Sequence, residues 1–164
     1  MKNFMRALLI ASVAALAFTA CKKDDAKPVA DAAPALQAPA KDDDAGWKQY
    51  LQAVAIQNMG NVTNSPFLYY LPPESDPEFQ AKYERQVEGA TTTISRGVSP
   101  GNMIAFGSSA SAKMADMIGV VFKDVQANSM KGVRIVYIGD AADNARVQTV
   151  IQPTGAEYIF VEAK

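Results

Sequence analysis

Residues 103–138 read MIAFGSSASAKMADMIGVVFKDVQANSMKGVRIVYI, and this stretch decides the fold class. It begins and ends with short apolar runs, 103–106 and 133–138, which are typical of buried strands. Between them, apolar side chains recur at helical spacing over about 109–126, which predicts an amphipathic helix. A strand, a helix and a second strand in this order indicate parallel strands joined by a crossover helix.

The same alternation continues on both sides of this stretch. Apolar runs at 66–71 and 157–161 predict two further strands. Asp76 and Pro77 are typical of an N-cap and a first helical residue, so a helix is expected to begin there. Another helix is expected over about 142–151, with Asp140 or Asp143 as its cap.

An amphipathic helix is predicted over 46–58, because Trp47, Tyr50, Leu51 and Val54 recur at helical spacing and form its inner face. This helix precedes the first strand. We therefore expect an α/β fold: a small three-layer domain with a four-stranded, mostly parallel sheet and flanking helices, preceded by an N-terminal helix. The pattern does not decide the strand order, and 2-1-3-4 is taken as a working hypothesis.

The composition excludes several kinds of chemistry. The chain has 164 residues, a net charge of −1, no histidine and one cysteine. Histidine-ligated zinc, a histidine general base and a histidine-containing triad are therefore excluded. An internal disulfide and a CxxC pair are excluded as well. The charge balance offers no basic stripe of the kind that recruits nucleic acid.

The first twenty residues, MKNFMRALLIASVAALAFTA, have the pattern of an export signal. Lys2 and Arg6 form a cationic start, and an apolar stretch too short to span a membrane follows. Residues 18–21, Phe-Thr-Ala-Cys, place a small residue directly before the only cysteine. This segment resembles the signal of bacterial lipoproteins, although Phe18 stands where that signal usually has an aliphatic residue.

The resemblance implies cleavage before Cys21 and lipid on its sulfur. Lys22 follows in place of the aspartate associated with retention at the inner membrane, which implies an outer-membrane lipoprotein facing the periplasm. Residues 21–45 are then the lipidated cysteine and a tether rich in Ala, Pro, Asp and Lys, a composition typical of disorder. The globular domain is expected over 46–164.

Polar residues follow three of the predicted strands, and in open α/β sheets ligands bind at the carboxyl ends of strands. Glu74 follows the first strand, Gly107, Ser108 and Ser109 follow the second, and Asp140 follows the third. A Gly-Ser-Ser turn before a helix offers N–H and hydroxyl donors to an anion. The same residue types are also common as helix caps and turns.

No catalytic residue and no cofactor is indicated, because the dinucleotide, phosphate-loop and nucleophile-elbow motifs are all missing. We expect a membrane-anchored periplasmic lipoprotein that acts as a non-enzymatic binding or envelope-associated module. Its partners would be the membrane and an envelope protein or a small anion. One alternative is a metal-assisted hydrolase or anion-binding domain that uses the strand-end residues, with Glu74 and Asp140 holding a cation if they are neighbours. Another is an inhibitor or immunity lipoprotein presenting loop 72–77 or 97–102.

Overall fold

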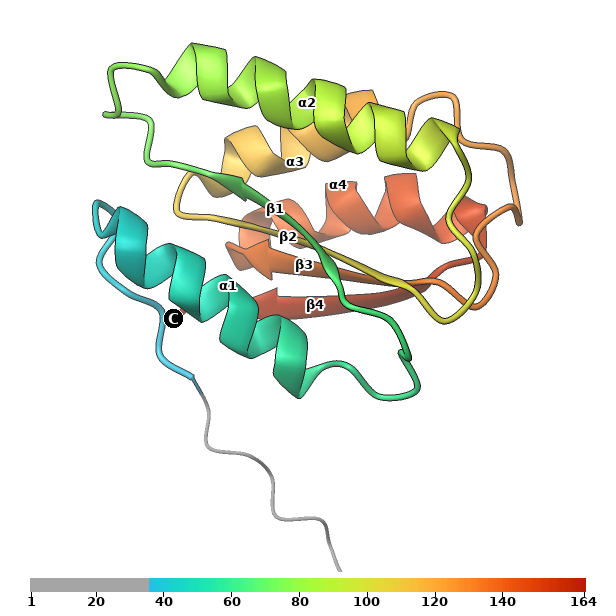
Figure 1. Ribbon diagram of the computed structural model, residues 1–164. Helices are drawn as coiled ribbons and strands as arrows, with labels where there is room; N and C mark the ends of the chain where they lie inside the picture. The colour runs from blue at the N-terminus through green and yellow to red at the C-terminus, as the bar shows by residue number, and fades with distance from the viewer. Residues whose placement is uncertain (1–35) are drawn as a thin grey trace, which may run out of the picture. The chain divides into compact units, whose positions relative to one another are not determined.

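A four-stranded, all-parallel sheet is the centre of the computed structural model, which describes residues 36–164 (Figure 1). The predicted signal peptide, Cys21 and the tether residues 22–35 lie outside the described residues. The strands are β1 (Phe67–Leu71), β2 (Met103–Ser108), β3 (Arg134–Gly139) and β4 (Glu157–Glu162). The helices are α1 (Asp44–Gln57), α2 (Phe79–Ser95), α3 (Ser111–Val121) and α4 (Ala141–Ile151), and a short 3-10 turn, Gln152–Thr154, follows α4.

The small three-layer α/β fold with a leading helix is thus confirmed, but the strand order is β1-β2-β3-β4 and not 2-1-3-4. Each strand pairs with the next one in the chain. When all crossovers have the same handedness and each leads to the next strand in one direction across the sheet, their helices lie on the same face. Accordingly α2, α3 and α4 all cover one face, and α1 lies on the other (Figure 1).

Alternating side chains of the strands build the two halves of the core. Phe106 and Tyr137 point to the three-helix face, whereas Ala105 and Val136 point to α1. Every residue of β2 is buried, as expected for a central parallel strand with helices on both faces. On the α1 face the core includes Trp47, Tyr50, Leu51 and Val54, which confirms the predicted inner face of this helix.

The folded part begins earlier in the chain than predicted. α1 starts at Asp44, and the Asp43 side chain caps it by accepting from the Gly46 N–H at 2.9 Å. Before it, Leu36 and Ala38 pack against the α1 side of the core. The Ala38 N–H also bonds to the Lys164 carbonyl at 3.0 Å. Residues 36–43 therefore belong to the domain rather than to a tether.

Two other helix boundaries differ from the prediction. α2 begins at Phe79 and not at Pro77, because Asp76 caps a separate turn: its Oδ1 accepts from the Glu78 N–H, and its carbonyl accepts from the Phe79 N–H. α3 is limited to Ser111–Val121, and residues 122–130 continue as turns. Among residues 36–164, none of the helices is both long and apolar enough to traverse a bilayer.

Candidate functional site

The strand order separates two of the residues expected at a common site. Glu74 is exposed in the turn after β1, and Asp140 is exposed after β3. In the order 2-1-3-4 these strands would be neighbours, but here β2 lies between them, at about 4.8 Å per strand spacing. Among the described residues no group of three or more His, Cys, Asp or Glu side chains is placed to hold a metal ion.

The polar groups at the end of β2 are largely engaged within the protein. The Ser108 hydroxyl donates to the Leu71 carbonyl and accepts from the Ala110 N–H, both at 2.9 Å. Gly107 is buried, and a Cβ there would lie 3.0 Å from the Leu51 Cδ1 of α1. The Ser109 hydroxyl is buried and has no hydrogen-bond partner in residues 36–164. Ser108 therefore ties β2 to β1 and to the start of α3.

A hydrogen-bonded cluster that the sequence analysis did not assemble joins the ends of β2 and β3. Ser111, which is 3% exposed, donates to Asp143 Oδ2 at 2.6 Å and accepts from the Asp140 N–H at 2.8 Å. Because the Asp143 carboxylate only accepts, the Tyr137 hydroxyl at 2.8 Å donates to the Ser111 Oγ. Arg146 then pairs with Asp143 at 2.9 Å. This cluster holds the N-terminal ends of α3 and α4 together.

The carboxyl end of β1 differs from the other strand ends, because helices leave it on opposite faces. α1 covers one face beside β1 and α2 covers the other, so their N-terminal halves flank the open edge of the sheet (Figure 1). A cavity of about 250 Å³ lies there. The strand order does not reverse, so this hollow lies at the edge of the sheet and is not the crevice of a doubly wound sheet.

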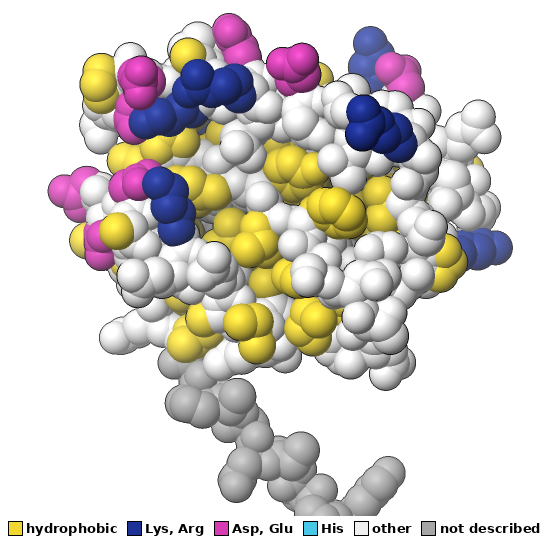
Figure 2. Space-filling view, viewed as in Figure 1, with side chains coloured by type: hydrophobic (Ala, Val, Ile, Leu, Met, Phe, Trp, Pro, Cys, Tyr) yellow, Lys and Arg dark blue, Asp and Glu magenta, His cyan; other side chains and the backbone are white. Residues whose placement is uncertain are grey.

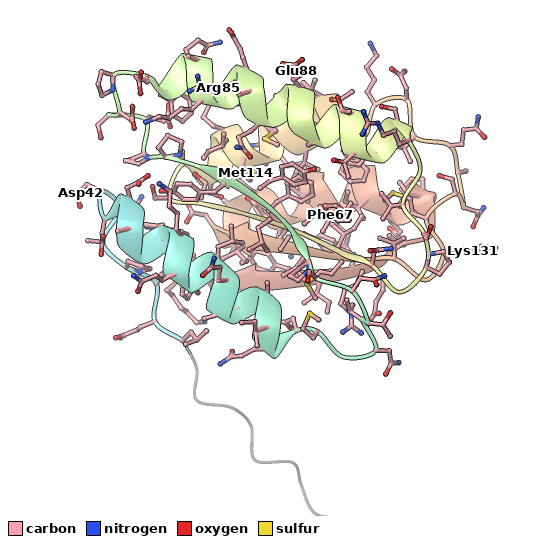
Figure 3. The ribbon with its side chains drawn as sticks, in the orientation of Figure 1. Asp42, Phe67, Arg85, Glu88, Met114 and Lys131 are labelled. Atoms are coloured by element: carbon pink, nitrogen blue, oxygen red, sulfur yellow. The ribbon has the colours of Figure 1, made fainter. Side chains whose placement is uncertain are left out.

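Three basic side chains and one acidic side chain line this cavity. Lys48 and Asp44 come from α1, and Lys82 and Arg85 come from α2. Figure 3 labels Arg85 on the first half of α2, and Figure 2 shows Lys and Arg side chains of both helices at the end of the molecule where they begin. The N-terminal ends of both helices lie at the same end, where Asp43 caps α1 and Asp76 accepts from the Glu78 N–H directly before α2.

The two lysines each pair with a carboxylate but keep unused N–H donors. Lys48 pairs with Asp44 at 2.6 Å, and its Nζ lies 5.5 Å from the centre of the Tyr70 ring. Lys82 pairs with Asp76 at 2.7 Å. Contact with these lysines keeps the pKa of both carboxyl groups below its usual value. A lysine has three N–H donors, so each of these two can still donate to a ligand.

Tyr70 lines the cavity, and its hydroxyl oxygen is buried. The hydroxyl makes no hydrogen bond of standard geometry within residues 36–164, but the Asp44 carboxylate is close enough to act as its acceptor. Burial, together with this carboxylate, raises the pKa of Tyr70 well above its ordinary value. The hydroxyl therefore stays protonated and faces a carboxylate of the protein.

No protein-family model, curated protein or solved structure matches this chain.

Three larger hollows are lined by fewer basic side chains. One of about 430 Å³ lies between the C-terminal ends of α2 and α3, and Asp124 is its one charged lining residue. A second, of about 480 Å³, lies between α3 and α4, where Arg146 pairs with Asp116 at 2.6 Å. The third, of about 600 Å³, lies between α1 and the end of β4. Its charged residues, Glu162 and Lys164, pair with each other at 2.7 Å. We therefore take the cavity at the end of β1, called the β1 cavity below, as the candidate site.

Proposed function

We propose that this chain is an exported lipoprotein, anchored by lipid on Cys21, whose α/β domain is a non-enzymatic binding module in the bacterial envelope. The observation that carries the proposal is the position of the only cysteine directly after a cationic start, a short apolar stretch and a small residue. Lys22 supports sorting to the outer membrane, with the domain facing the periplasm.

The domain described here fits a tethered arrangement. Leu36 and Ala38 pack against its core, and residues 22–35 lie between them and the proposed anchor in the sequence. A chain of this length spans at most about 50 Å when fully extended, which is the upper limit on the distance from the anchor to Leu36. Several acyl chains on one terminus anchor a protein stably, whereas a single chain does so marginally.

The polar groups at the strand ends support binding rather than catalysis. Ser108 and Ser111 are both buried and use their hydroxyls to join strands and helices. A catalytic nucleophile must instead reach substrate and have an activating base. The β1 cavity has the lining of a binding site: lysine, arginine and tyrosine side chains around a small volume.

The proposal is tested by expressing the full chain and its Cys21→Ala variant in a Gram-negative host. The wild-type protein is expected in the outer-membrane fraction, with a mass increased by the lipid. Cys21→Ala is expected to lose both the added mass and the detergent-phase partition. Lys22→Asp serves as the sorting control and should move lipidated protein to the inner membrane. An intact amino terminus, or an unmodified thiol in a soluble fraction, overturns the proposal.

A further inference from the structure

We infer that the β1 cavity binds the phosphate group of a small ligand or of a lipid headgroup. This inference rests on the proposed binding role and names the chemistry that such a ligand would carry. Its first support is that three cations, Lys48, Lys82 and Arg85, line the cavity together with one carboxylate, that of Asp44. Two further carboxylates, Asp76 and Glu78, lie beside Lys82 outside the lining.

The second support is the arrangement of the donors. Lys48 comes from α1, Lys82 and Arg85 come from α2, and Tyr70 of β1 lines the cavity with its ring 5.5 Å from the Lys48 Nζ. A planar carboxylate is best met by one bidentate arginine, whereas a tetrahedral group presents oxygens in several directions. Donors that come from two facing helices around a volume of about 250 Å³ therefore suit a phosphate better than a carboxylate.

Each of the two lysines also affects the pKa of the carboxylate that pairs with the other lysine. Lys82 on α2 lowers the pKa of Asp44 on α1, and Lys48 on α1 lowers the pKa of Asp76 beyond β1. The two pairs thus form one electrostatic cluster across the cavity. Glu78, 3.5 Å from Lys82, adds a further negative charge. These carboxylates keep the lysines in place, and they also make the expected affinity modest.

Arg85 is the side chain that a ligand would recruit. It is exposed at the rim of the cavity, and it makes no ion pair or hydrogen bond with any residue from 36 to 164. A guanidinium has five N–H donors in a planar fork, a geometry that matches phosphate oxygens. Arg85 can therefore close on a bound phosphate without breaking any contact of the free protein.

The experiment titrates inorganic phosphate into the full chain in an uncharged detergent and follows amide chemical shifts by NMR. Saturable shifts are expected around Lys48, Tyr70 and Arg85. Arg85→Gln should weaken phosphate binding about five- to tenfold, because one charge-assisted contact is lost. The matched control is Arg96→Gln, an exposed arginine at the far end of the same helix, which should bind like the wild type.

Two competitors then identify the source of the phosphate group. Displacement by glycerol phosphate alone supports a soluble phosphate ester, and displacement by phosphatidylglycerol vesicles supports a lipid headgroup. The inference is overturned if shifts do not saturate, if Arg85→Gln and Arg96→Gln bind equally, or if neither competitor acts. Phosphate binding does not require lipid on Cys21. The titration therefore tests the cavity, whereas the mass and the membrane fraction test lipidation, and either proposal can fail without the other.

Discussion

Replacing Ser111 by alanine is expected to be among the most damaging single-atom deletions in the domain. The change removes one buried oxygen that joins three groups: the Tyr137 hydroxyl, the Asp140 N–H and the Asp143 carboxylate. A buried polar group left without its partner costs about 1–3 kcal/mol. Tyr137 keeps a longer contact of 3.3 Å to the Ser111 carbonyl, and Asp143 keeps its arginine. We therefore expect unfolding free energy to fall by roughly 2–4 kcal/mol.

Urea unfolding followed by tryptophan fluorescence measures this effect, since Trp47 is the only tryptophan and is buried. Two tyrosine variants provide a matched control. Tyr137→Phe removes a bonded hydroxyl and should cost about 1 kcal/mol. Tyr70→Phe removes a buried hydroxyl that makes no hydrogen bond of standard geometry and has only the Asp44 carboxylate near it, so it should cost less stability than Tyr137→Phe. The reasoning fails if Ser111→Ala unfolds like the wild type, or if both tyrosine variants lose equal stability.

Two further predictions use the same unfolding assay. Gly139→Ala should destabilise the domain, because its Cβ would lie 2.5 Å from the Tyr137 hydroxyl. In Gly89→Ala, the new Cβ on α2 meets no atom within 4 Å, so this variant should be more stable than the wild type by about 0.5–1 kcal/mol. Equal unfolding free energies for the two variants would contradict this reasoning. Burial raises the pKa of Tyr137 from 10.0 to about 12, so above pH 10 the unfolded chain loses a proton that the native chain keeps. Stability should therefore hold up to about pH 9 and decline between about pH 10 and 12, and a profile that stays flat to pH 12 rules this out.

The sequence pattern was sufficient for the elements but not for their lateral order. Periodicity depends on which faces of an element are buried, so it located all four strands and the inner faces of α1 and α3. Strand order depends on which strands pair with each other. The four apolar runs are too similar in composition to indicate these pairs. One signal was available: Pro66 and Pro72 flank β1, and proline is tolerated at sheet edges. That signal favours β1 at an edge.

The candidate site was hidden for a related reason. Lys48, Tyr70 and Arg85 come from three separate elements, and their proximity depends on α1 lying on the opposite face from α2. Nothing in the amphipathic pattern of α1 indicates which face it covers. Ser108 shows the opposite error: its residue type suited an anion site, but the carbonyl of Leu71 takes its only proton.

The succession of strands in chain order has a consequence for how the molecule assembles. Every crossover links adjacent strands, so each strand pairs with the one that precedes or follows it in the chain. Parallel pairing still requires each crossover to close first, which is slow compared with the local contacts of a helical bundle. α1 adds a longer closure, because it packs on Ala105 and Val136, which lie far beyond it in the sequence. We therefore expect α1 to dock only after β2 and β3 have paired.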